Sequence, residues 1–360
     1  MRISCHKYSL FLFTFIPLML AACIQANTTK LESLAPLSAE QLQEVKIADH
    51  TNLDEVTFLV LGDMGTGGAN QQAVANAMVA FCDQPGNSCD FITTLGDNIY
   101  RDGVNSTADS KLQTNFEEPY AGLGRIDMWL TPGNHDWLRA DSVQSEVDYT
   151  TKSDRWRMPY NHYLVPNLPP WLHIYAIDTT ILRFQVWQLD DPDANKVLNT
   201  AVEDMLAAAR LELCGQLGWR ILFGHHPIYS SGKHGISEDK TGIITSVQVG
   251  LDTLVEECDV QVYMAGHDHH QEIVQANGLT QIVQGAGGRY LRDINQSESL
   301  IGERWSAQRF GFAAVNATPN QLLIRFFGVD SFGDEWEELC NWELAADGEI
   351  ESKSADCKLK

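Results

Sequence analysis

Five short segments of the sequence place residue types that bind metals directly after a glycine. They are Gly62-Asp63, Gly96-Asp97, Gly133-Asn134-His135, Gly224-His225 and Gly266-His267-Asp268-His269. A carboxylate can bridge two cations, imidazoles suit iron, zinc or manganese, and an Asn side chain adds a neutral oxygen. Glycine permits tight turns and a close approach of the backbone. Together these types indicate a site for a pair of hard-to-borderline cations.

Single segments are weak evidence for such a site. An Asp or His beside a glycine is most often an ordinary turn residue. His267 and His269 give a stronger signal, because residues two apart in an extended segment point to the same side. Asp268 between them should face away and have a supporting role. Five such segments in one chain are hard to explain by turn chemistry, so we interpret them as parts of one site.

Each segment follows an apolar run of strand length. These runs cover residues 56–61, 91–95, 128–131, 219–223 and 260–265, and a sixth lies at 173–177. Helices are predicted over residues 71–81, 196–213 and 244–257, and further strands over 278–284, 310–316 and 321–328. Alternating strands and helices are typical of an α/β fold, whose binding crevice lies beyond the carboxyl ends of the strands. The predicted fold therefore delivers the five segments to one crevice.

The five segments, in this order, resemble the calcineurin-like metallophosphoesterase superfamily and, more narrowly, the purple acid phosphatases of the small mammalian, tartrate-resistant type. Similarity continues between the segments, in Arg155-Trp156, Ile177-Asp178-Thr179 and Gly285-Ala286-Gly287. It covers about residues 54–330. The resemblance implies two packed mixed β-sheets flanked by helices, in αββα layers. The sequence patterns by themselves support only the α/β content.

The resemblance also implies a set of metal ligands. Ferric iron would be held by Asp63, Tyr100 and His269. A second ion, Fe(II), Zn or Mn, would be held by Asn134, His225 and His267, and Asp97 would bridge the two ions. Tyr100 is the most informative of these residues, because a phenolate is a hard, anionic ligand that favours ferric iron. The alternative for Tyr100 is a packed aromatic ring at the start of a loop.

The implied activity is that of an acid phosphatase, in which a metal-bound hydroxide attacks a phosphate monoester. His135, which follows a ligand, and His234, nine residues after His225, are the candidate catalytic residues. His226 and His270 either orient ligands or are simply exposed. One alternative is a phosphodiesterase or nucleotide hydrolase on the same site. A second alternative is a non-catalytic phosphate- or metal-binding lipoprotein.

The N-terminus has the pattern of an export signal. Arg2 and Lys7 precede a short apolar run over residues 10–20, which ends in Leu20-Ala21-Ala22-Cys23. That ending resembles a bacterial lipobox, which implies removal of residues 1–22, acylation of Cys23, and anchoring to a bacterial membrane, with Ile24 resembling an outer-membrane context. Simple cleavage near Ala26 is the alternative.

Three regions follow the signal. We expect a tether over residues 23–52, in which Ser38 could cap a short helix. A metallophosphoesterase domain is expected over residues 53–330, and residues 331–360 would form an extension packed on the domain or trailing from it.

Charge and cysteine content limit the partners and the compartment. A formal net charge of −23 repels nucleic acids and anionic membrane surfaces, so bound cations must attract any phosphate. We expect a small phosphate ester as substrate, membrane contact through the lipid only, and a monomer. The six cysteines after Cys23 allow 15 pairings. Proximity in sequence and the expected strand order favour Cys82–Cys89, Cys214–Cys258 and Cys340–Cys357.

Overall fold

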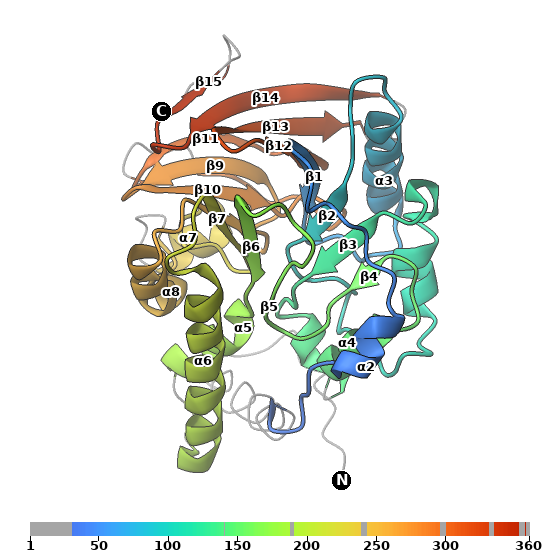
Figure 1. Cartoon of the computed structure of the whole chain (residues 1–360), viewed down its shortest axis with the longest axis vertical. Coiled ribbons are helices and arrows are strands. Elements are labelled where there is room, and N and C mark those ends of the chain that lie inside the picture. Colours follow the sequence, from blue (N-terminus) through green and yellow to red (C-terminus); the bar gives the residue numbers. More distant parts are fainter. Residues whose placement is uncertain are drawn as a thin grey trace.

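The computed structural model describes residues 31–139, 141–187, 191–238, 243–295, 300–330, 335–352 and 357. Two mixed β-sheets stack on each other and helices flank them (Figure 1). The predicted fold class is thereby confirmed. The signal peptide, Cys23 and residues 23–30 of the predicted tether lie outside the described residues.

The first sheet has eight strands in the order β15-β14-β13-β12-β1-β2-β3-β4. Its centre is parallel, since β1 pairs with β2 and β2 with β3 in the same direction, whereas β12 to β15 run antiparallel. The strands are β1 (Val56–Leu61), β2 (Phe91–Thr94), β3 (Asp127–Leu130), β4 (Trp156–Arg157), β12 (Gly311–Ala317), β13 (Gln321–Val329), β14 (Trp336–Ala345) and β15 (Ile350–Ser352).

The second sheet has seven strands in the order β11-β9-β10-β8-β7-β6-β5. Here β6, β7, β8 and β10 are parallel to one another. The strands are β5 (Tyr163–Leu164), β6 (Leu172–Ala176), β7 (Trp219–Phe223), β8 (Val262–Ala265), β9 (Gln271–Ala276), β10 (Leu279–Gln284) and β11 (Glu303–Ala307). All residues of β1 and β7 are buried, as expected for parallel strands covered on both faces.

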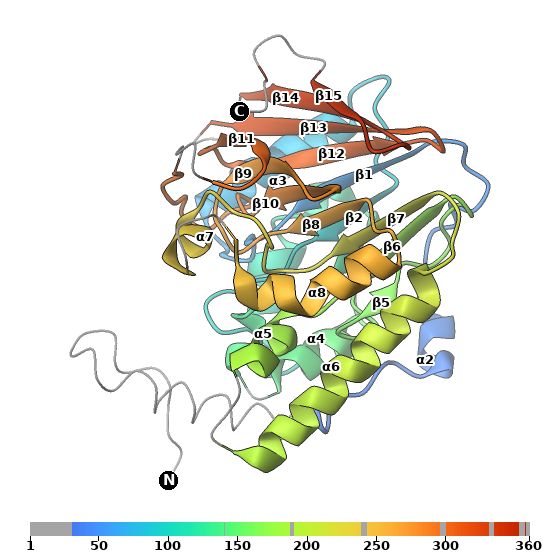
Figure 2. The same cartoon turned by 90° about the vertical axis from the view of Figure 1, so that its left-hand side faces the viewer.

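Helices cover the outer faces of the two sheets. α3 (Ala69–Cys82) packs on the first sheet against β12 and β13, and α5 (Thr179–Trp187), α6 (Pro192–Leu213) and α8 (Thr245–Glu257) pack on one another beside the second (Figure 2). The remaining helical segments are α2 (Ala39–Glu44), α4 (Ser142–Tyr149), α7 (Lys233–Glu238), a π-turn at Gln113–Glu117 and 3₁₀ turns at Ala121–Leu123 and Asp136–Leu138. Among the described helices, none combines the length and the apolar character that a bilayer crossing requires.

The start of α6 illustrates how local sequence determines a helix boundary. The Asp191 side chain accepts hydrogen bonds from the backbone N–H groups of Asp193 and Ala194, and Pro192 occupies the first helical turn. Both features stabilise a helix N-terminus, because the first N–H groups lack partners within the helix.

Residues 31–52 of the predicted tether lie against the domain. Leu31, Leu34 and Leu37 are buried, and the Leu37 N–H donates to the Pro159 carbonyl at 2.9 Å. Ser38 caps α2 through a reciprocal capping box with Gln41. At the other end of the chain, β14 and β15 lengthen the first sheet.

All three favoured disulfides are confirmed. They join Cys82 to Cys89, Cys214 to Cys258 and Cys340 to Cys357. The Cys214–Cys258 bond links the end of α6 to the end of α8, just before β7 and β8. This agrees with the expectation that those two strands are neighbours.

Candidate metal centre

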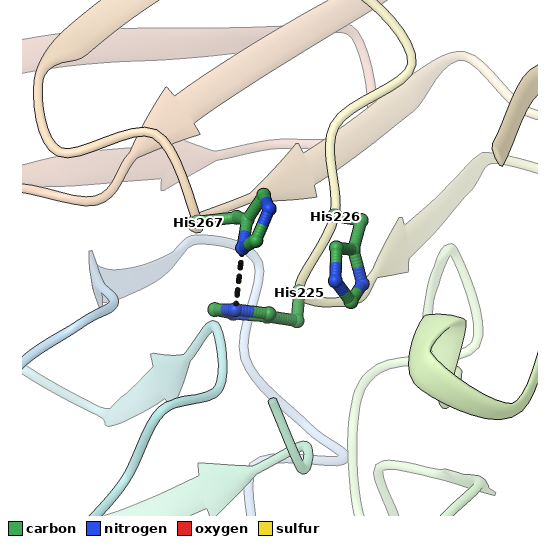
Figure 3. A group of neighbouring side chains, drawn as sticks. All are labelled: His225, His226 and His267. Atoms are coloured by element: carbon green, nitrogen blue, oxygen red, sulfur yellow. Dashed lines mark hydrogen bonds between the residues drawn. The ribbon is translucent and has the colours of Figure 1, made fainter. Parts of the chain in front are cut away.

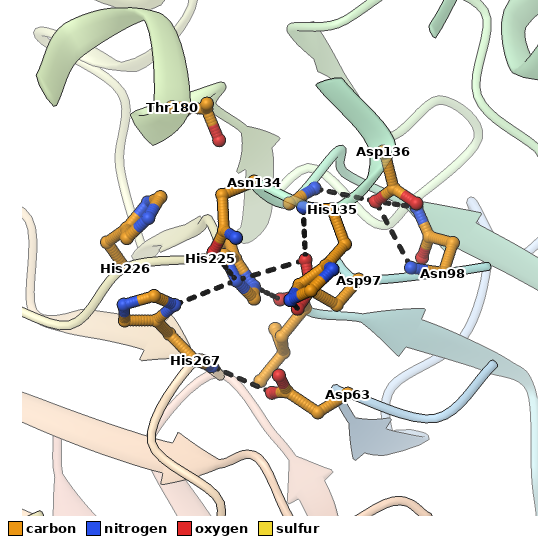
Figure 4. A network of polar contacts seen from close by, with 12 residues as sticks. Asp63, Asp97, Asn98, Asn134, His135, Asp136, Thr180, His225, His226 and His267 are labelled. Carbon is orange, nitrogen blue, oxygen red and sulfur yellow. Dashed lines mark hydrogen bonds and ion pairs between the residues drawn. The ribbon is translucent and has the colours of Figure 1, made fainter. Parts of the chain in front are cut away.

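The loops after β1, β2, β3, β7 and β8 meet at one edge of the two sheets and bring the five segments together (Figure 4). One side-chain atom from each of Asp63, Asp97 and His225 lies within 4.8 Å of the others, and all three residues are buried. The glycines allow this crowding. A Cβ on Gly133 would stand 2.3 Å from Oδ1 of Asp97, so no larger residue fits there.

Three residues of this edge have a left-handed backbone that is uncommon for side chains with a Cβ. They are Asp63 (φ 56°), Asp97 (φ 53°) and His267 (φ 66°). Such conformations cost free energy and gather at functional sites, where the surrounding structure holds them in place. Here the Asp63 N–H donates to Gly96 O at 3.1 Å, and the His267 N–H donates to Oδ2 of Asp63 at 2.7 Å.

The predicted ligands of the first ion converge. Nε2 of His269 is 3.3 Å from Oδ1 of Asp63, and the Tyr100 hydroxyl donates to Oδ1 of Asp63 at 2.8 Å and to Oδ2 of Asp97 at 2.7 Å. Burial alone would raise the pKa of Asp63, but His269, His225 and Tyr100 lower it to about 2. Burial and the two carboxylates raise the pKa of Tyr100 well above its usual value. A bound cation would reverse this effect on Tyr100, because it favours the phenolate.

The predicted ligands of the second ion converge beside the first group. Nε2 of His225 lies 3.2 Å from Oδ1 of Asn134 and 3.3 Å from Oδ1 of Asp97 (Figure 4). Nδ1 of His267 is 3.2 Å from the same His225 nitrogen (Figure 3). Asp97 thus directs one oxygen to each group. Burial lowers the pKa of His267 well below its usual value, so its ring is neutral, the form that binds metals.

Backbone carbonyls fix the orientation of two imidazoles. Nδ1 of His225 is 2.7 Å from Leu95 O, and Nδ1 of His269 is 2.7 Å from Tyr290 O. Because a carbonyl only accepts hydrogen bonds, each Nδ1 carries a proton, and each Nε2 is the nitrogen that faces the carboxylates. Lone pairs facing oxygens at these distances repel each other unless a proton or a cation lies between them. The donor set therefore fits metal ions.

The two predicted catalytic histidines flank the centre in different ways. Nε2 of His135 is 3.8 Å from Oδ2 of Asp97, its ring lies 4.7 Å from the Tyr100 ring, and its side chain is partly exposed. The centre of the His234 ring lies 4.0 Å from that of the His267 ring, with the two planes tilted by 37°, and Nε2 of His234 contacts the Arg292 guanidinium. Burial lowers the pKa of His234 to about 4. The charge of Arg292 acts in the same direction, and the charge of Asp268 opposes both effects. His234 is therefore neutral near pH 7.

Buried groups beneath the centre hold its loops together. Asp136 accepts from the N–H groups of Gly133 (2.7 Å), Asn98 (3.1 Å) and Ile99 (3.2 Å), which joins the loops after β2 and β3. Burial and then Asp97 raise the pKa of Asp136 to about 7.

The residues beside the predicted ligands are buried as well. Asp268 accepts from the Ser230 hydroxyl at 2.5 Å and from the His234 N–H at 3.3 Å, as expected for a group facing away from the centre. Nδ1 of His226 is 3.0 Å from the Thr179 hydroxyl, and Nε2 of His270 is 2.9 Å from Glu272. Neither histidine is exposed, so the exposed alternative for both is wrong.

Several basic residues near the centre have no counterpart in the sequence prediction. Nη1 of Arg183, on α5, is 3.5 Å from Nε2 of His267. Arg289 and Arg292 follow β10, and the Arg289 guanidinium carbon lies 4.8 Å from the centre of the Tyr100 ring. Residues 278–284 are a predicted strand. The expectation that binding residues follow the carboxyl ends of strands would therefore have pointed to the segment after residue 284. All seven predicted ligands and both predicted catalytic residues do lie at this one site, and their roles there stay predictions.

Comparison with known proteins gives a family for this arrangement. A family model described as calcineurin-like phosphoesterase matches residues 56–271. The human tartrate-resistant acid phosphatase type 5 is 27% identical over 337 residues, covering 86% of this chain and 94% of the relative. Purple acid phosphatase 7 of Arabidopsis thaliana is 27% identical over 240 residues, covering 65% of this chain and 70% of the relative.

Solved structures share the fold at lower sequence identity. GAP50, the anchor in the inner membrane complex of Plasmodium, superposes with a TM-score of 0.64 at 20% identity, covering 82% of this chain and 90% of that chain. The purple acid phosphatase PPD1 from yellow lupin seeds superposes with a TM-score of 0.56 at 15% identity, covering 81% of this chain and 54% of that chain.

Proposed function

The chain belongs to the calcineurin-like phosphoesterase family and is a metal-dependent phosphatase, and on this premise we propose that it hydrolyses phosphate monoesters with the help of two metal ions. The observation that carries the proposal is the position of Asp97. One of its oxygens accepts from Tyr100, beside Asp63 and His269, and the other faces His225, beside Asn134 and His267. A carboxylate between two donor groups is the arrangement that a bridged pair of cations requires.

The two donor groups differ in chemistry, which supports different ions. Asp63, Tyr100 and His269 would hold Fe(III), because a phenolate and a carboxylate are hard, anionic ligands. Asn134, His225 and His267 would hold Fe(II), Zn or Mn, which suit imidazole and neutral oxygen. When bound, the ions would supply the Lewis acidity that activates a water and withdraws charge from the phosphoryl oxygens.

Residues of the chain supply positioning and a proton. His135 directs Nε2 toward the centre while its Nδ1 contacts the Arg101 carbonyl, so Nε2 is the atom that would protonate the leaving alkoxide. His234 is neutral and its Nε2 accepts from Arg292, so it would contact the substrate rather than protonate it. Asp136 keeps the loops that carry Asp97 and Asn134 at a fixed separation.

The test uses the full chain purified without chelators. Elemental analysis and a visible spectrum are combined with rates of hydrolysis of 4-nitrophenyl phosphate and bis(4-nitrophenyl) phosphate. We expect about two metal ions per chain, one of them iron, a visible absorption band from iron–phenolate charge transfer, and faster hydrolysis of the monoester. Faster hydrolysis of the diester would overturn the monoester assignment. A colourless protein without iron would overturn the Fe(III) assignment.

We also propose that the protein is exported and held at a bacterial membrane by a lipid on Cys23. The sequence Leu20-Ala21-Ala22-Cys23 supports this location, and so do three disulfides, which persist in oxidising compartments. Cys23→Ser should move the protein from the membrane fraction to the soluble fraction. A wild-type protein without an acyl group by mass spectrometry would contradict the proposal.

A further inference from the structure

The segment after β10 is tied by its backbone to the loops that carry the predicted ligands. The Gly287 N–H donates to Gly62 O at 3.0 Å, the Arg289 N–H to Asp63 O at 2.9 Å, and the Arg292 N–H to His269 O at 3.2 Å. His269 in turn donates from Nδ1 to Tyr290 O. The backbone of Arg289, Tyr290 and Arg292 is therefore held beside the candidate metal centre.

Two guanidinium groups of this segment flank the centre. Arg289 lies between two aromatic rings, with its guanidinium carbon 4.8 Å from the Tyr100 ring centre and 4.7 Å from that of Tyr290. Arg292 contacts Nε2 of His234, whose ring centre lies 4.0 Å from that of His267. One guanidinium thus stands on the Tyr100 side of the centre and the other on the His267 side.

Carboxylates compensate the charges of these two arginines only weakly. Within the part of the chain that the structure describes, Arg289 has no carboxylate at ion-pair distance, and Arg292 has only Asp268 at 4.0 Å. The guanidinium carbons of Arg289 and Arg292 lie 4.7 and 5.6 Å from the centre of the same Tyr290 ring, so the two charges are close to each other. The positive charge is therefore local, in a chain with 25 basic and 48 acidic residues.

Two guanidiniums beside a phosphatase centre, one of them paired with a carboxylate only at 4.0 Å, have a chemical use. A guanidinium presents a planar fork of N–H donors that matches the oxygens of a carboxylate or a phosphate. In an acidic protein, such a pair also attracts anions that the rest of the surface repels. In the proposed reaction the metal ions would bind the phosphoryl group that reacts, so the arginines are available to another anionic group of the same substrate.

We propose that Arg289 and Arg292 bind a second oxyanion, a carboxylate or a phosphate on the leaving group, so that the enzyme prefers phosphate esters whose leaving group is itself anionic. The inference rests on the proposed phosphatase activity, because it names the substrate class of that same site. Arg289 and Arg292 are specificity-determining residues in this proposal.

The kinetic test compares phenyl phosphate with 4-carboxyphenyl phosphate, which differ by one carboxylate on the leaving group. The metal-loaded full chain is assayed as wild type and as Arg289→Gln, Arg292→Gln and the double variant. We expect wild type to prefer the carboxylated ester in kcat/KM and the double variant to lose about tenfold of that preference. The ratio of the two substrates cancels any general loss of activity. Arg210→Gln, which removes the same charge from α6 at its pair with Glu257, should leave the ratio unchanged.

A binding test separates this inference from the proposed function. Phenylphosphonate, 4-phosphonobenzoate and 1,4-phenylenebisphosphonate cannot be hydrolysed, and calorimetry gives their affinities for the same proteins. The inference is supported if the wild type binds either compound with a second anion more tightly than phenylphosphonate, and if this preference falls about tenfold in the double variant. The more tightly bound of the two compounds identifies the preferred anion. Equal affinities of the wild type for all three compounds would overturn it, whether or not the protein is active. A binding preference without hydrolysis of any ester would overturn the proposed function alone.

Discussion

The parallel and antiparallel parts of the two sheets differ in whether their strands lead to the predicted ligands. β1, β2, β3, β7 and β8 run parallel to a neighbour and end in the loops that carry all the predicted ligands, whereas β12, β13 and β14 run antiparallel and carry none. Burial differs in the same way. Every residue of β1 is buried, but buried and more exposed residues alternate along much of β14. Parallel strands bring many loops to one edge, which a meander of hairpins does not.

Backbone conformation sharpens this contrast. Six non-glycine residues have a positive φ among the described residues, and three of them are predicted ligands at the ends of parallel strands. The other three, Asn167, Asp259 and Asn277, are Asn or Asp, the types that tolerate this region best. Half of these residues are therefore predicted ligands at the candidate metal centre, and changes there should affect function far more than equal changes elsewhere.

Removal of the charge of Asp97 should cause the largest loss of metal and of turnover. Asp97→Asn leaves the shape but weakens the carboxylate that faces both donor groups, so we expect loss of bound metal and a fall in kcat of about 10³-fold or more. Metal analysis and kinetics on the same sample measure both. Asp347→Asn, the same change in the turn between β14 and β15, should alter neither quantity. Full metal content in Asp97→Asn would contradict the bridging role.

A smaller loss should follow from removing the proton donor. His135→Ala should retain its metal ions, because the side chain is not among the predicted ligands, and lose about 10²-fold in kcat. His173→Ala, on β6 at the amino end of the parallel strands, should keep full turnover. If His135→Ala also kept full turnover, His135 would not be the acid.

A still smaller effect on turnover is expected for Tyr100→Phe. Loss of the phenolate should abolish the visible absorption band while reducing kcat by about tenfold, since Asp63, Asp97 and His269 would remain. Tyr175→Phe, at a buried position of β6, should leave the band unchanged. An unaltered visible spectrum in Tyr100→Phe would show that Tyr100 is only a packed aromatic.

Changes in the antiparallel region should affect stability and leave catalysis intact. Phe327 on β13 is buried against Phe81, Phe312 and Trp336, at ring distances of 5.1, 5.0 and 5.6 Å. Phe327→Ala should lower the free energy of unfolding by about 3–5 kcal/mol, while metal content and kcat at low temperature stay at wild-type values. A loss of metal in this variant at a temperature where it is folded would show that the two regions are coupled.

Strands with a strong local pattern could be predicted from the sequence. β1 has the predicted bounds, because its apolar run is uninterrupted and ends in Gly62-Asp63. β9 has no counterpart among the predicted strand ranges, because it begins directly after the histidine segment without a turn residue, and its first residues, Gln271 and Glu272, are polar although buried. Buried polar residues are held by tertiary hydrogen bonds, such as that from the Gln271 amide to Phe327 O at 3.1 Å.

The sequence by itself determined the α/β content and the five loops that bear metal-binding residues, because residue type and strand period are local properties. The two-sheet layering and the choice of candidate ligands came from the resemblance of those loops to a known family. Only the tertiary structure decided which atoms face one another. Nε2 of His225 is presented by a bond to Leu95 O across 130 residues, and the His267 N–H donates to Asp63 across 204 residues. The placement of Arg289 and Arg292 beside the centre also arises there. Contacts over such separations depend on how the two sheets stack, which no local pattern encodes.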